Sequence, residues 1–266
     1  MSLRDSIGTT VGDETFEMGR VVSRTFGAIG RNWVSFFTLA VFTVVPQLIL
    51  SAYLGVGVVA RGKPVDLSNL GHFWGMMGIV YLAALVLNSV LQAALVHGTV
   101  SDLNGKKASF GDCLQTGLRT CFPVIGLSIV FGIALMFGFI LLLVPGILMF
   151  LAWAVIVPVL VVEKTGVFGA FGRSSELTKG HRWAILGLAV VLWLISIVLS
   201  FAIMPFQSAL VLPGEGILAM APLLVINGVV SVITTTLAAT GTASVYYELR
   251  SIKEGIGPEQ LAAVFD

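Results

Sequence analysis

The chain has 266 residues, of which 57% are hydrophobic and only 11% are charged, and its mean hydropathy is +1.00. Soluble domains carry roughly 45–50% apolar and about 25% charged residues, so these values exclude an ordinary water-soluble protein and indicate that lipid covers most of the surface. The net charge of +1 gives no reason to expect a nucleic-acid partner.

Charge-free stretches give the predicted membrane spans in chain order. They are residues 32–60, 67–101, 120–162, 183–214 and 216–247. A helix needs about 20 residues to cross the hydrocarbon core. The third stretch is roughly twice that length, and Pro145-Gly146 near its middle predicts a very short turn between two spans. The sequence therefore predicts an all-α polytopic membrane protein with six transmembrane helices arranged as three hairpins.

The basic residues orient these spans. Of the 15 Lys and Arg residues, only Arg61 and Lys63 fall on one side, which leaves 15 − 2 = 13 on the other. Basic residues concentrate on the cytoplasmic side of membrane proteins. We therefore expect both termini in the cytoplasm. The opening residues lack the apolar core and cleavage site of a secretory signal, so we also expect the first span to be retained.

Three cytoplasmic segments are amphipathic, and each leads into an odd-numbered span. The first places apolar residues at three- and four-residue steps: Met18, Val22, Phe26, Ile29 and Trp33. The second begins at Ser109, a predicted N-cap, and the third runs from Thr165 to His181, where Ser175 and Thr178 interrupt its apolar stripe. We expect each hairpin to be preceded by such a cytoplasmic interfacial helix.

The predicted organisation is a six-span membrane domain over residues 14–250, between cytoplasmic tails at 1–13 and 251–266. A threefold repeat would divide it into 14–104, 109–164 and 165–250, because Asp102, Glu163 and Glu248 each close an even-numbered span before a basic segment. The alternative is that any six-span protein has charged, amphipathic loops.

Polar residues inside the spans are costly unless they are paired, so they point to function or to packing. A predicted polar groove between the second and sixth spans would be formed by Asn88, Gln92, Asn227, Ser231 and Thr235. The alternative is that these side chains hold helices together by hydrogen bonds.

Residues 14–260 resemble a bacterial family, the YciC-like or glycerophosphodiester phosphodiesterase membrane-domain-like integral membrane proteins, with the most specific motifs in the second half of the chain. The similarity lies in Val144-Pro145-Gly146, in the stretch from Pro158 to Glu163, in the segment from Arg173 to His181, and in the C-terminal YYELRSIKEG. The sequence departs from the family at Ser175, where Trp is usual. The resemblance implies a bacterial inner-membrane location. In members fused to a phosphodiesterase the soluble partner carries out the chemistry, and we expect no such partner here.

No catalytic residue, cofactor site or metal site is expected, because the sequence has no metal-ligand motif and pairs no nucleophile with a base. The expected partners are membrane lipids, chiefly anionic head groups, together with a membrane or cytoplasmic protein. The lipid-binding candidates are Arg20, Arg24, Arg31, Lys106, Lys107, Arg119, Arg173, Lys179 and Arg182. The leading hypothesis is a non-enzymatic protein that organises or senses anionic lipid for envelope homeostasis. The alternative is a transporter or lipid-translocating protein that uses the polar groove, and an intramembrane enzyme is a third hypothesis.

Overall fold

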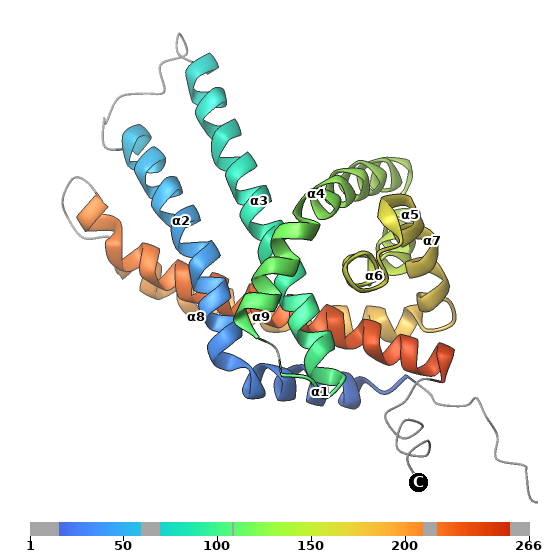
Figure 1. The fold of residues 1–266 in the computed structure, drawn as a ribbon. Coiled ribbons are helices and arrows are strands. Elements are labelled where there is room, and N and C mark those ends of the chain that lie inside the picture. The colour runs from blue at the N-terminus through green and yellow to red at the C-terminus, as the bar shows by residue number, and fades with distance from the viewer. Residues whose placement is uncertain (1–15, 60–69, 108, 210–216, 256–266) are drawn as a thin grey trace, which may run out of the picture.

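The computed structural model describes residues 16–59, 70–107, 109–209 and 217–255. These residues form nine helices and no strand (Figure 1). In chain order the helices are α1 (Met18–Arg31), α2 (Trp33–Val59), α3 (Leu70–Leu103), α4 (Phe110–Leu141), α5 (Leu143–Ala152), α6 (Ile156–Glu163), α7 (Gly166–Thr178), α8 (Arg182–Ala209) and α9 (Ile217–Glu254). The predicted tail at 1–13 and residues 256–266 of the other tail lie outside the described residues.

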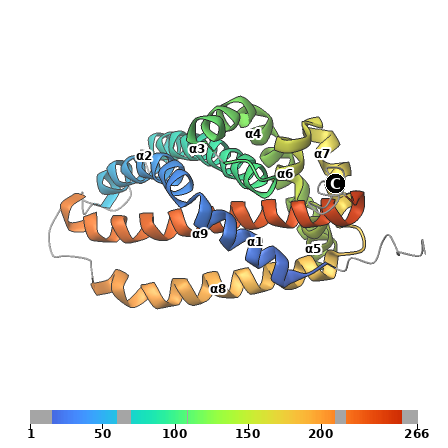
Figure 2. The same ribbon diagram turned by 60° about the horizontal axis from the view of Figure 1, so that its bottom comes forward.

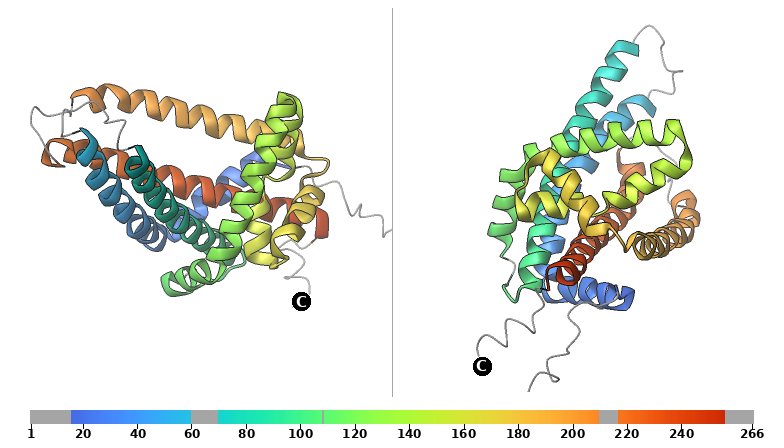
Figure 3. Two further views of the ribbon diagram at one scale, coloured as in Figure 1. Left: turned by 90° about the horizontal axis from the view of Figure 1, so that it is seen from above. Right: turned by 90° about the vertical axis from the view of Figure 1, so that its right-hand side faces the viewer.

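The prediction of an all-α polytopic membrane protein is confirmed. Five segments are long and apolar enough to cross a bilayer: they lie in α2, in α3, in α4, across α5 and α6, and in α9. A sixth candidate is the pair α7 and α8, which meet at 100°. Because α7 is turned so far from α8, the pair fits an interfacial helix that leads into a span, as the sequence predicts. The hairpin partners α2 and α3 lie side by side (Figure 3).

The turn between α4 and α5 is shorter than predicted and lies earlier. The chain reverses at a single extended residue, Leu142, with φ −168° and ψ 150°. Pro145 and Gly146 belong instead to the start of α5, where proline is tolerated because the first amides of a helix have no partner within it. Gly146 allows close packing of the hairpin, since a Cβ atom there would lie 2.5 Å from the Phe139 ring.

The return span is broken between α5 and α6, at Trp153–Val155. Two amides in and beside this break, those of Ala154 and Ile156, donate to carbonyls three residues back, at 3.4 and 3.2 Å. The helix α7 packs on the break and supplies the missing donors, because Ser174 Oγ and Thr178 Oγ1 both donate to the Ala152 carbonyl, at 3.0 and 3.1 Å. The break is therefore satisfied by protein, as backbone within a membrane must be.

The three predicted interfacial segments differ in form. The first is a separate helix, α1, which crosses α9 in Figure 2. Its predicted apolar stripe faces outward, with Phe26 and Trp33 each 61% exposed, whereas Val21 and Ala28 on another face are buried. The third is α7. The second is continuous with its span as one helix, α4, which changes direction along its length in Figure 1. Pro123 lies within α4, and an internal proline commonly kinks a helix without ending it.

Two buried apolar clusters hold the described helices together. One joins α3, α6 and α9 around residues such as Val159 and Tyr246, and the other joins α2, α3 and α9 around Phe36 and Leu91. Outside these clusters, large apolar side chains remain exposed, among them Phe122 at 83% and Trp193 at 63%. Such a surface is compatible with acyl chains and not with water.

Candidate functional site

The acidic residues that close the even-numbered spans each pair with an arginine of an interfacial helix. Glu248 on α9 is the most deeply buried, with 1% of its side chain exposed. Arg24 of α1 donates to its Oε2, and Nε of Arg20 lies 3.3 Å from Oε1. Arg24 also lies over the Tyr247 ring, 5.1 Å from the centroid. Two cations thus balance one buried carboxylate and attach α1 to α9.

Asp102, at the end of α3, pairs with the opposite end of α1. Arg31 donates to it from Nη2 at 2.6 Å and from Nε at 3.1 Å, and Asn32 Nδ2 donates at 2.6 Å. The hydrogen bonds to Asp102 raise the pKa of Arg31 above its ordinary value, so this cation stays charged. Asp102 therefore fixes the corner between α1 and α2.

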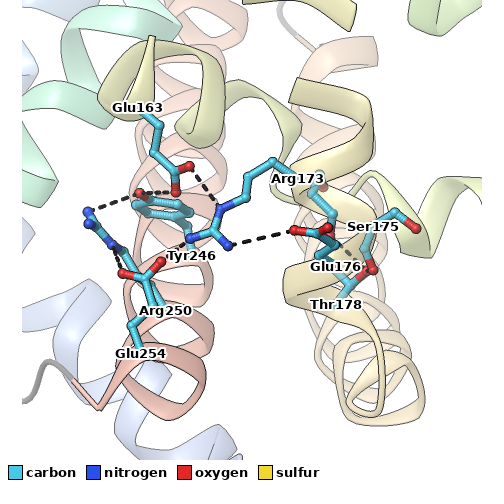
Figure 4. A network of polar contacts seen from close by, with 9 residues as sticks. Glu163, Arg173, Ser175, Glu176, Thr178, Tyr246, Arg250 and Glu254 are labelled. Carbon is cyan, nitrogen blue, oxygen red and sulfur yellow. Dashed lines mark hydrogen bonds and ion pairs between the residues drawn. The ribbon is translucent and has the colours of Figure 1, made fainter. Parts of the chain in front are cut away.

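A third cluster joins α6, α7 and α9 (Figure 4). Arg173 of α7 donates to Glu163 at 2.9 Å and also to Glu254. The Tyr246 hydroxyl donates to the other Glu163 oxygen at 2.9 Å and accepts from Arg250 at 3.3 Å. Every charged group in this cluster is paired, so it fastens α7 to the ends of two spans.

These contacts divide the nine lipid-binding candidates into two groups. Arg20, Arg24, Arg31 and Arg173 pair with carboxylates of the protein, and Arg182 lies 3.4 Å from the Ser175 hydroxyl. The other group is exposed and makes no ion pair within the described part of the chain: Lys106, Lys107, Arg119 and Lys179.

The five residues of the predicted polar groove do not come together in either of two hollows, one among six helices and one between α2 and α9. Asn88 and Asn227 are exposed, and Ser231 and Thr235 are half-buried. Gln92 alone of this set lines a cavity of about 350 Å³, which lies among α3, α4, α5, α6, α8 and α9. A separate groove of about 520 Å³ between α2 and α9 has apolar walls from residues such as Val44 and Val229.

Sequence reasoning missed the pairing of acids with arginines and the role of the hydroxyl groups on α7. The sequence did contain a signal for the acid–arginine pairs, since the span-closing acids and most of the arginines are assigned to the same side of the membrane. The role of the α7 hydroxyl groups was indicated only by the interruption of the apolar stripe at Thr178. Among the described residues no group of His, Cys, Asp and Glu is placed to hold a metal ion.

Comparisons with known proteins place part of the chain in a family. The curated proteins and the solved structures give no match. A domain of unknown function, DUF7847, matches residues 108–249, which is 142 of the 266 residues and covers α4 to most of α9. The match includes Glu163, Arg173 and Tyr246 but not α1, which carries the partners of Asp102 and Glu248. The chain belongs to the DUF7847 family of domains of unknown function.

Proposed function

We propose that this protein is a non-enzymatic component of the bacterial inner membrane, similar to the YciC-like proteins, that gathers anionic lipid at its cytoplasmic face. Both termini lie in the cytoplasm in this proposal. The resulting lipid environment supports envelope homeostasis or a protein partner.

One observation carries the proposal: within the described residues four exposed cations make no ion pair, and two of them are close in sequence to exposed apolar side chains. Arg119 on α4 is flanked by Leu118, which is 59% exposed, and Phe122, which is 83% exposed. Lys179 precedes Trp183, which is 81% exposed. An apolar side chain that enters the acyl region next to a cation at head-group depth is typical of an interfacial lipid contact.

The four cations that make no ion pair within the described ranges set the strength of this binding. Each cation near an anionic leaflet contributes about 1 kcal/mol, so removing Lys106 and Lys107 should weaken binding by about 30-fold. The paired arginines contribute less, because their charge is already balanced within the protein.

The test is retention of phosphatidylglycerol by the purified protein in native mass spectrometry, with phosphatidylethanolamine as the uncharged comparator. Lys106→Gln/Lys107→Gln should lose phosphatidylglycerol and retain phosphatidylethanolamine. The matched control is Arg61→Gln/Lys63→Gln, which removes the same charge from the side that the sequence assigns to the periplasm. Equal retention by wild type and both variants would overturn the proposal.

A transporter or lipid-translocating protein is the second candidate, favoured by the cavity that Gln92 lines. Proteoliposomes with a fluorescent phospholipid test it directly. Translocation above that of empty liposomes would support this candidate, and a rate equal to theirs would count against it.

A further inference from the structure

The cavity of about 350 Å³ has walls of mixed character, although it lies among membrane spans. Most of the lining is apolar, for example Phe131 and Leu192, but Gln92, Ser128 and Thr242 contribute polar groups. None of the lining residues is charged. The volume is at the lower end of the range for small-molecule sites, about 300–1,000 Å³.

With the ion-paired helix ends at the cytoplasmic surface, as in the proposed function, the cavity lies within the inner half of the bilayer. Gln92 precedes Asp102 by ten residues and Thr242 precedes Glu248 by six. At 1.5 Å per residue this places the polar groups roughly 9–15 Å along their helices from the ion-paired ends. A ligand at this depth comes from the membrane.

The polar groups on the wall remain able to bind a ligand. The Ser128 hydroxyl donates to its own helix at 2.8 Å, and that of Thr242 does so at 2.7 Å. Each oxygen keeps lone pairs that can accept. Gln92 has no hydrogen-bond partner within the described residues, so its amide is free both to donate and to accept.

The helix break provides an independent indication of a site. Trp153 and Ala154, at the break between α5 and α6, line the cavity. The Trp153 ring packs edge-on against two other rings, and its centroid lies 6.1 Å from that of Phe131 and 4.9 Å from that of Phe171. Broken helices in membrane proteins are tolerated where they line a cavity, and they often mark binding sites.

We propose that this cavity binds an uncharged, hydroxyl-bearing amphiphile, such as a long-chain alcohol or a monoacylglycerol, with its hydroxyl group among Gln92, Ser128 and Thr242. The amphiphile's hydroxyl donates to a serine or threonine oxygen and accepts from the glutamine amide. Its chain lies along the apolar wall. A charged head group is disfavoured, because no lining residue would balance its charge. This site is separate from the surface cations, so either proposal can fail alone.

The test uses three photoactivatable long-chain probes with a click handle: an alcohol, the corresponding alkane and the corresponding carboxylic acid. Gly241→Leu should reduce the volume of the cavity, because Gly241 lines it and is buried, yet an added Cβ atom there would meet nothing within 4 Å. Gly132→Leu is the control, since an added Cβ atom at Gly132 also meets nothing within 4 Å, but Gly132 is exposed and does not line the cavity. Gln92→Leu removes the amide, and its control is Asn88→Leu, one turn away on α3 and exposed.

The alcohol should label wild-type peptides that contain Gln92 or Trp153 more strongly than either other probe does. Gly241→Leu should abolish that labelling and Gly132→Leu should preserve it. Gln92→Leu should weaken labelling by the alcohol by about fivefold and leave the alkane unaffected. If Gly241→Leu does not fold, as judged by size-exclusion chromatography, the Gln92→Leu and Asn88→Leu pair decides alone. Equal labelling by alcohol and alkane, preferred labelling by the acid, or unchanged labelling of Gln92→Leu would overturn the proposal.

Discussion

The cluster around Glu248 predicts that removing its two arginines is more damaging than removing the acid itself. Glu248 has 1% of its side chain exposed, whereas Arg24 has 18% and Arg20 has 33%. Arg20→Gln/Arg24→Gln leaves a buried carboxylate without a counter-charge, which should cost about 3–5 kcal/mol. Glu248→Gln leaves two cations that can turn toward water, so we expect a cost of about 1–2 kcal/mol.

The free energy of unfolding can be measured by SDS titration in mild detergent, with thiol labelling of Cys113 and Cys121 as the signal. Both cysteines are free and buried in the folded protein. Adding Glu248→Gln to the double arginine variant should recover part of the lost stability, because it removes the unbalanced charge.

The control is Glu17→Gln, which removes an exposed carboxylate that lies 3.3 Å from the same Arg20. Its side chain is 61% exposed, so the loss should be below about 1 kcal/mol. The reasoning is refuted if the double arginine variant is no less stable than Glu248→Gln, or if the triple variant is less stable than the double.

Two further changes test packing. A Cβ atom at Gly117 would lie 2.5 Å from the Val90 carbonyl oxygen. Gly117→Ala should therefore lower the free energy of unfolding by about 1–3 kcal/mol in the same titration, because it forces α3 and α4 apart. Unchanged stability would show that the two helices are not in such close contact. Ser174→Ala/Thr178→Ala should cost about 1–3 kcal/mol and speed hydrogen exchange in α6, because the Ala152 carbonyl loses both donors. Either single variant should be milder, and a double variant that exchanges like wild type would argue against this support.

The spans could be predicted because they depend on composition alone. A stretch without charge and about 20 residues long is able to cross the membrane, whatever its neighbours are. Details that depend on neighbours were harder to predict. Pro145 was interpreted as a turn from its residue type, but proline also suits the first turn of a helix. The short turn at Leu142 instead leaves Gly138 and Gly146 close together across the hairpin, with a Cβ atom at Gly138 only 3.3 Å from Gly146 Cα.

The hydroxyl groups on α7 show why the apolar pattern of a single segment was not enough to predict their role. From the sequence, Thr178 interrupts an apolar stripe and so weakens a membrane-facing helix. In the fold, Ser174 and Thr178 face the protein and supply the donors that the break after Ala152 requires. The pattern could not reveal this, because the acceptor lies 26 residues earlier in the chain. The Ser175 hydroxyl, which also interrupts the stripe, lies 3.4 Å from Arg182 Nη2.

The ion pairs also connect the predicted repeat with the proposed lipid contact. Glu163 pairs with the interfacial helix that follows it, α7, and Glu248 pairs with α1. In both cases the acid pairs with an arginine of the next interfacial helix, if α1 is counted as following α9. On this pattern Asp102 would pair with Arg119 on α4, but it pairs with Arg31 on α1. The helix that Asp102 leaves without this ion pair, α4, is the one whose interfacial segment is continuous with its span. Arg119 is therefore left exposed close to Phe122, and it is one of the exposed cations on which the proposed lipid binding depends.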